Sequence, residues 1–233
     1  MMPNYFSPEA SQPETLAKLS YGGGFERLST WLLFMLSGAR RTGLAPLDAN
    51  RLHLLLFYGA VLTPVYGLEQ PVPLIVKVDD APYYPEAQEA VERLVVSGMV
   101  INLGRRRIGR NNTGHKRLEN DRYDLASPGL ALVELLRRPP ASERLYSFAH
   151  DLCKGFSEIG EMSAEDVAAE DALLRDDSLQ NKSSAWIKRT GTNRVLEAAR
   201  WIADYEEAGG RPNKREEVAL YFLYLQELRR RAA

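Results

Sequence analysis

The sequence predicts a mainly α-helical protein that carries one small β-hairpin in its first half and only helices in its second half. Apolar residues recur at helical spacing through most of the chain, as at Leu28, Leu32 and Leu36. Strand-like runs are few, and the clearest pair, 100–103 and 123–126, flanks a turn rich in glycine and asparagine. Apolar stripes of helical period then resume and continue almost to the last residue.

Composition limits the classes of function. A chain of 233 residues with 45% hydrophobic and 26% charged residues can bury a sizeable core, as one large or two small domains. The formal net charge of −1 excludes a global field that would draw the whole chain onto nucleic acid or an anionic membrane. Cys153 is the only cysteine, which excludes an internal disulfide and favours a cytoplasmic protein. The longest early apolar run, residues 32–36, is far too short to span a bilayer.

Two helices are expected in the first third of the chain. The first should pack by the face that contains Phe25. The second begins at Asp48, a favourable N-cap, and should run to about Leu62, because Pro64 interrupts helical hydrogen bonding. This second helix is apolar nearly all round, so we expect it in the centre of the core with His53 on its polar side.

A proline-rich connection and a third helix follow. Residues 63–85 contain five prolines and one strand-like run, 74–78. Pro85 suits the first turn of a helix that ends before Gly98. The side chains expected to face inward are Ala87, Val91, Leu94 and Val95, and those expected to face outward are Glu86, Glu89, Glu92 and Arg93.

The two hairpin strands come next, and Val100 and Tyr123 are expected to attach them to the core. A further helix begins at Ser127 and Pro128, and the sequence RRPPAS at 137–142 ends it. This break predicts three parts, which are a flexible N-terminus at 1–22, a first domain at 23–138 and a helical C-terminal domain at 139–233.

The predicted C-terminal domain is all-helical. Its first helix has an apolar stripe made of Leu145, Phe148, Leu152, Phe156 and Ile159. A strongly acidic helix at 163–177 begins with a capping box, and residues 178–192 are expected to form a polar loop before another helix near 195–202. Asn213 and Glu216 should cap the last helix, whose apolar stripe consists of Val218, Tyr221, Phe222, Leu225 and Leu228.

No pattern typical of catalysis or of metal binding occurs in the sequence. His53, His115 and His150 do not lie at metal-ligand spacing with one another or with Cys153, which we interpret as a small buried residue. The glycines at 22–24 lack the lysine and hydroxyl residue of a phosphate-binding loop. The acids of 163–177 are interpreted as a solvated helix face, so we predict a protein that is not an enzyme and has no cofactor.

The most informative segment lies between the two hairpin strands. It contains six basic residues and no acid among them, namely Arg105, Arg106, Arg107, Arg110, Lys116 and Arg117. Three interpretations are open: the side chains contact the nucleic-acid backbone, they contact a protein partner, or they belong to a loop that contacts only solvent. The preceding helix presents three carboxylates, and only Gln88 and Arg93 offer base contacts, which argues against sequence-specific reading.

The order helix, strand, basic loop, strand resembles the end of a winged-helix domain. The resemblance covers about residues 81–136 and rests on LVVSGMVINLG followed by YDLASPGLALV, so the basic loop corresponds to the wing. The overall layout also resembles the middle component of bacterial ABC-three-component antiphage systems of the Lamassu type. That resemblance implies an accessory subunit that works beside an SMC-like ATPase and an effector subunit. A stand-alone winged-helix transcriptional regulator is the alternative.

Four apolar residues lie off the main helical stripes and are predicted to form a partner interface. They are Trp31, Phe34, Leu220 and Leu223. Apolar side chains on a second face of a helix often contact another chain, so we expect a hetero-oligomer.

Overall fold

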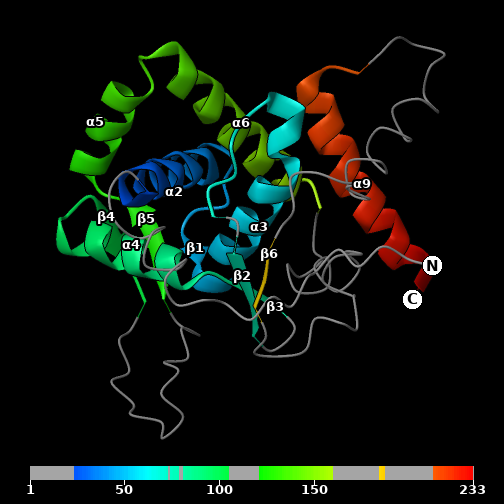
Figure 1. Cartoon of the computed structure of the whole chain (residues 1–233), viewed down its shortest axis with the longest axis horizontal. Helices are drawn as coiled ribbons and strands as arrows, with labels where there is room; N and C mark the ends of the chain where they lie inside the picture. The colour runs from blue at the N-terminus through cyan, green and yellow to red at the C-terminus, as the bar shows by residue number, and fades with distance from the viewer. Residues whose placement is uncertain are drawn as a thin grey trace, which may run out of the picture.

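The computed structural model describes residues 24–72, 74–78, 81–104, 121–159, 184–186 and 212–232. In these residues the chain is mainly helical, with two small antiparallel sheets (Figure 1). The described helices are α2 (Gly24–Arg41), α3 (Ala49–Tyr66), α4 (Pro85–Val96), α5 (Ser127–Leu136), α6 (Pro140–Ser157) and α9 (Lys214–Ala232). The described strands are β1 (Leu47–Asp48), β2 (Leu74–Val78), β3 (Ala81–Tyr83), β4 (Val100–Asn102), β5 (Arg122–Leu125) and β6 (Ser184–Trp186).

Helix α2 lies at the centre and packs against α4, α5, α6 and β5. Every residue from Trp31 to Ala39 is buried, so this helix has no solvent-facing side over two and a half turns. The predicted face is buried at Leu28, Leu32, Met35 and Leu36, but Phe25 itself is 36% exposed. The first turn lies outside the core, and the ring of Phe25 is covered there by the guanidinium of Arg93 at 4.6 Å.

Helix α3 begins as predicted, because the Asp48 carboxylate accepts a hydrogen bond from the backbone N–H of Arg51 at 2.8 Å. It does not end before Pro64, however, and continues to Tyr66. Proline cannot bond to the carbonyl four residues earlier, which belongs to Ala60. The Thr63 hydroxyl and the Gln70 amide donate to that carbonyl at 2.9 and 3.3 Å, so the helix continues without an orphaned acceptor.

The first sheet has the strand order β1-β5-β4, and both pairs are antiparallel. Val100 and Tyr123 are each 1% exposed, so the prediction that they attach the hairpin to the core is confirmed. Helix α4 immediately precedes β4, and the turn between them contains Gly98 with a positive φ of 73°.

The second sheet has the order β3-β2-β6 and was only partly predicted. The run at 74–78 forms β2 as expected, but it pairs with a further strand, β3, to make a hairpin between α3 and α4. Residues 184–186, expected in a polar loop, form β6 and pair with β2. A three-residue strand has too few alternating positions to be recognised by period alone.

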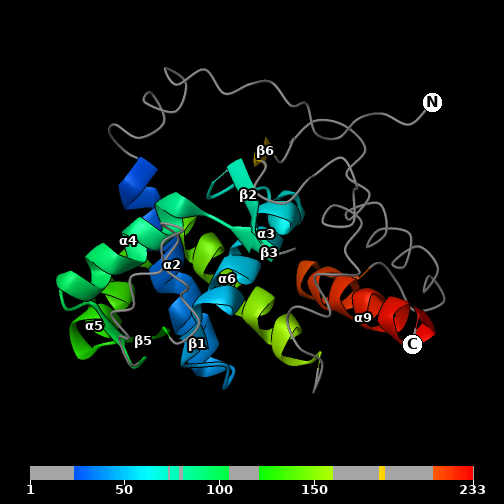
Figure 2. The ribbon, with the colours of Figure 1, turned by 90° about the horizontal axis from the view of Figure 1, so that it is seen from below.

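Helix α6 packs against α2 and α3, and α9 packs against α6 and α3 (Figure 2). The break predicted between 137 and 142 exists, since α5 ends at Leu136 and α6 begins at Pro140. Across this break, α6 packs most extensively against α2, and the buried apolar residues form one cluster from Leu28 to Leu225. The described parts of the two predicted domains therefore share a core.

The helical stripes of the second half are largely confirmed. The buried members are Phe148, Leu152, Phe156 and Ile159 near α6 and Val218, Tyr221, Phe222 and Leu225 on α9. The predicted capping box is also present, because the Asn213 side chain accepts from the N–H of Glu216 at 3.1 Å and the Glu216 carboxylate accepts from the N–H of Asn213 at 2.7 Å. The expected segments at 1–22, 163–177 and 195–202 lie outside the described residues.

Candidate functional site

The basic residues of the predicted wing, from Arg105 to Arg117, lie outside the described residues. The structure does describe the two chain ends that bound this segment, at Gly104 and Asp121. Strands β4 and β5 bring these ends together, and the N–H of Leu103 donates to the carbonyl of Arg122 at 2.7 Å.

Two polar side chains hold the ends of the basic segment in place. The Asn102 amide donates to the Asp121 carboxylate at 2.9 Å. The carbonyl oxygen of the same amide accepts from the backbone N–H groups of Gly104 at 2.9 Å and Arg122 at 3.2 Å. Asn102 and Asp121, which we call the stem clamp, thus join both strands of the hairpin at the point where the basic segment leaves it.

The stem clamp continues into helix α4. The Tyr123 hydroxyl donates to Asp121 at 3.3 Å and accepts from the Gln88 amide at 3.1 Å, and the same amide donates to Glu92 at 3.1 Å. Burial raises the pKa of Tyr123, so its hydroxyl remains a donor at neutral pH. Gln88, one of the two α4 side chains considered for base contacts, is only 6% exposed and connects α4 to the hairpin.

The outward face of α4 is acidic. Glu89 and Glu92 are exposed as predicted, and Glu89 forms an ion pair with Arg93, one turn further along the helix. Arg93 also covers the ring of Phe25, so its guanidinium is already engaged on two sides. The described α4 surface therefore offers carboxylates where a base-reading helix needs donors and uncharged amides.

His53 does not lie on a polar side of α3, and that prediction is wrong. It is 2% exposed, and its Nδ1 accepts from the backbone N–H of Tyr84 at 3.3 Å. The ring lies against that of Tyr83, with centroids 4.7 Å apart. Burial lowers the pKa of His53 to about 4. The imidazole is therefore neutral at pH 7 and part of the core.

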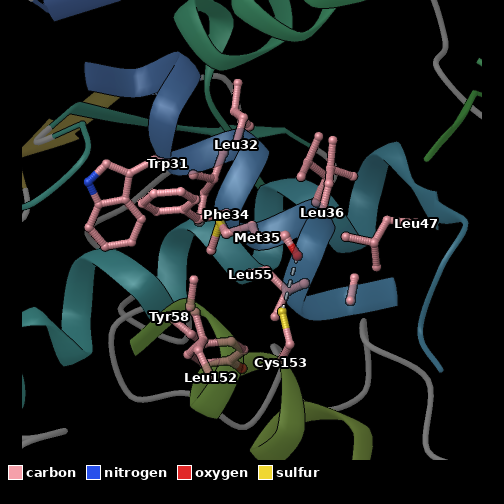
Figure 3. Close-up of a cluster of buried hydrophobic side chains, with 14 of the residues drawn as sticks. Trp31, Leu32, Phe34, Met35, Leu36, Leu47, Leu55, Tyr58, Leu152 and Cys153 are labelled. Atoms are coloured by element: carbon pink, nitrogen blue, oxygen red, sulfur yellow. Dashed lines mark hydrogen bonds between the residues drawn. The ribbon is translucent and has the colours of Figure 1, made fainter. Parts of the chain in front are cut away.

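The described residues contain no obvious site for a metal or a nucleophile. Within them, no group of three or more His, Cys, Asp or Glu residues is placed to hold a metal ion. Cys153 is fully buried, as predicted, and its thiol contacts the Met35 carbonyl at 3.4 Å (Figure 3). Burial raises the pKa of this thiol to about 12, so it stays protonated and unreactive at neutral pH.

The predicted partner interface divides into two parts. Trp31 and Phe34 are 2% and 0% exposed, so the prediction that they face a partner is wrong. Their rings meet Phe148 and Tyr146 of α6 edge to face, which makes them part of this chain's own core. Leu223 on α9 is 50% exposed, and Leu220 is partly buried.

A small cavity of about 210 Å³ lies between α6 and the start of α9. The Asp151 carboxylate at its wall accepts from the Tyr66 hydroxyl at 2.6 Å and lies 3.7 Å from Arg215. The cavity is smaller than most small-molecule sites, and carboxylates and cations alternate around it, so no one charge class of ligand is favoured. No local pattern in the sequence indicates this cavity, because its two walls come from α6 and α9, which are distant in the sequence.

In the part of the chain that the structure describes, no helix combines the length and the apolar composition needed to cross a bilayer. No protein-family model matches the chain, and neither a curated protein nor a solved structure matches it with significance.

Proposed function

We propose that this chain is a non-catalytic accessory subunit with a winged-helix domain, which contacts the DNA backbone without sequence preference and docks partner subunits. Its partners in this proposal are an SMC-like ATPase and an effector subunit of a cytoplasmic antiphage defence system, of the kind its layout resembles. The observation that carries the proposal is a two-stranded hairpin attached to a helical core, whose two strands are joined in the sequence by a segment with six cations.

The order of elements supports a winged-helix domain. The series α2–β1–α3–α4–β4–β5 places one strand after the first helix and two strands after the third. These three strands make one sheet with the last strand in its middle, β1-β5-β4. The hairpin of β2 and β3 is an addition between the second and third helices of this series.

Contact with phosphates rather than bases is supported by the charges. The basic segment contains six cations that can each displace counterions from DNA. Helix α4, which would be the base-reading helix of a transcriptional regulator, has exposed Glu89 and Glu92, while its Gln88 is buried against Tyr123. These features favour an accessory subunit over the regulator.

We expect the four arginines at positions 105, 106, 107 and 110 to provide sequence-independent affinity for DNA. Changing all four to alanine should weaken binding equally for unrelated duplexes, because backbone contacts carry no sequence information. The plot of log affinity against log salt should become shallower by up to about four units, if each arginine meets one phosphate. Fluorescence anisotropy with several duplexes over a salt series measures both quantities.

The matched control replaces the same four arginines by lysine, which keeps the charge and should retain most of the slope. Unchanged affinity of the alanine variant at low salt would show that the segment is a solvated loop. A defined operator sequence from a binding selection would favour the regulator instead.

Leu223 is expected to take part in contact with a partner subunit. The substitution Leu223→Glu adds a charge to a side chain that is already half exposed, so the fold should persist. We expect the variant to lose self-association or co-purification with the partner from the native host, as measured by light scattering and affinity purification. Val96→Glu is the control, because Val96 is 88% exposed on α4, and it should have no effect on assembly. A wild-type chain that stays monomeric at high concentration and co-purifies with nothing would contradict this prediction.

A further inference from the structure

Four arginines lie at the C-terminal ends of two helices, outside the basic segment of the hairpin. Arg40 and Arg41 end α2, and Arg137 and Arg138 follow the last residue of α5. We call these four side chains the arginine cluster. The chain as a whole has a formal net charge of −1, so such a concentration of cations is local.

One buried tyrosine brings the two helix ends together. Arg41 donates to the Tyr146 hydroxyl at 2.5 Å, and the guanidinium of Arg137 lies 5.3 Å from the centre of the same ring. Tyr146 itself is 6% exposed and packs edge to face on Phe34 in the core. The ring therefore gives two guanidinium groups a rigid support, which lowers the conformational entropy that binding would cost.

The cluster is also attached to the hairpin that carries the basic segment. Arg40 donates to the carbonyl of Leu125 at 3.2 Å and lies 3.8 Å from the Asp124 carboxylate. Both residues belong to β5, whose other end leads to the basic segment. Four residues of strand span roughly 13 Å, so the cluster lies about one strand length from the stem clamp.

The positive charge of the cluster is only partly balanced. Asp124 pairs with Arg40, and Glu134 pairs with Arg137 at 2.9 Å. Among the described residues, Arg41 and Arg138 have no carboxylate partner, and both are exposed. The C-terminal end of a helix carries a partial negative charge of about half a unit, which nearby cations offset. Helix α6, however, begins two residues after Arg138, and its N-terminal end is positive. Balancing helix dipoles thus accounts for only part of the cluster.

We propose that the arginine cluster is a second DNA-backbone contact, separate from the basic segment and built on the helical core. The inference rests on the proposed function for the identity of the ligand. All four side chains are arginine, whose planar donor pairs match two phosphate oxygens at once. A protein partner would need an apolar anchor at the centre of its contact, and Tyr146 is too deeply buried to provide one.

The test is the variant Arg41→Gln with Arg138→Gln in the full chain, with the basic segment unchanged. We expect weaker binding to unrelated DNA duplexes and a salt slope shallower by up to about two units, measured by anisotropy over a salt series. Circular dichroism and the midpoint of thermal unfolding check that the fold persists. The matched control is Arg230→Gln with Arg231→Gln, which removes two exposed cations from α9, on the other side of the molecule from α5, and should leave binding unchanged (Figures 1 and 2).

The failure of this inference can be told apart from the failure of the proposed function. If only the four-arginine variant of the basic segment loses affinity, the inference is overturned and the proposed function stands. If only the cluster variant loses affinity, the inference stands and the role of the basic segment is overturned. The inference is also overturned if the cluster variant and the wild type bind DNA equally well throughout the salt series.

A further variant separates DNA from other polyanionic or protein partners. Leu135 is 54% exposed and lies one helical turn before Arg138. The substitution Leu135→Gln should leave DNA affinity unchanged if phosphates are the ligand. A loss of affinity as large as that of the cluster variant would show that apolar packing rather than phosphate contact carries the binding, which overturns the inference. Full competition by anionic lipid vesicles at equal charge overturns the assignment to DNA in favour of a membrane surface.

Discussion

Replacing Phe34 by alanine should lower the free energy of unfolding by about 3–5 kcal/mol, the usual cost of removing a large aromatic side chain from a core. Phe34 is fully buried and meets Tyr146 edge to face, with ring centroids 5.4 Å apart. It lies where α2 packs against α6, the most extensive helix contact of the described structure. Equilibrium unfolding in urea, with the slope checked for two-state behaviour, measures the change.

The matched control is Leu223→Ala, because Leu223 is an apolar helical residue that is half exposed. Its effect should stay below roughly 1 kcal/mol, since most of the removed surface already contacts water. A small effect of Phe34→Ala on unfolding, together with loss of a partner subunit, would show instead that Phe34 lies between chains.

Local sequence signals predicted several elements correctly. Asp48 and the pair Asn213 and Glu216 mark helix starts because their side chains bond to backbone groups two or three residues away. Such bonds depend on nothing distant in the chain. The strand-like runs that contain Val100 and Tyr123 are local signals in the same sense, and both residues are buried.

The predictions for Trp31 and Phe34 in α2 and for His53 in α3 were wrong for one shared reason. A stripe analysis assumes that a helix buries one face, and residues off the stripe are then assigned to solvent or to a partner. Helices and a strand surround α2 on several sides, so Trp31 and Phe34 are buried although they lie off the stripe. His53 is buried in α3 because β3 covers the side of the helix that a single-face analysis leaves to solvent.

The candidate site was predictable only in its charges. Basic residues between two strands are visible in the sequence, and Glu89 and Glu92 on α4 are exposed as expected, while Glu86 is partly buried. The stem clamp was not predicted, because Asn102 and Asp121 are 19 positions apart and are joined only through the hairpin register. The arginine cluster was missed for the same reason, since Arg41 and Tyr146 are 105 positions apart.

Below pH 6.5, the substitution His53→Asn should remove part of the loss of stability that the wild-type chain shows. Burial lowers the pKa of His53 in the folded chain to about 4, from an ordinary value of 6.5. Between these two pH values the unfolded chain binds a proton that the folded chain does not, so stability falls as pH falls. The contribution is absent above pH 6.5 and reaches about 3 kcal/mol near pH 4.

Asparagine at position 53 retains an acceptor for the backbone N–H of Tyr84 but cannot take up a proton in this range. Urea unfolding at several pH values from 7.5 to 4 should therefore give a shallower pH dependence for the variant than for the wild type. Leu52→Ala is the control, because it removes a neighbouring buried side chain without a titrating group. It should lower stability by a similar amount at every pH and keep the wild-type slope. Parallel curves for His53→Asn and the wild type would show that water or a cation-stabilising group reaches the imidazole when it is charged, so that burial does not control its protonation.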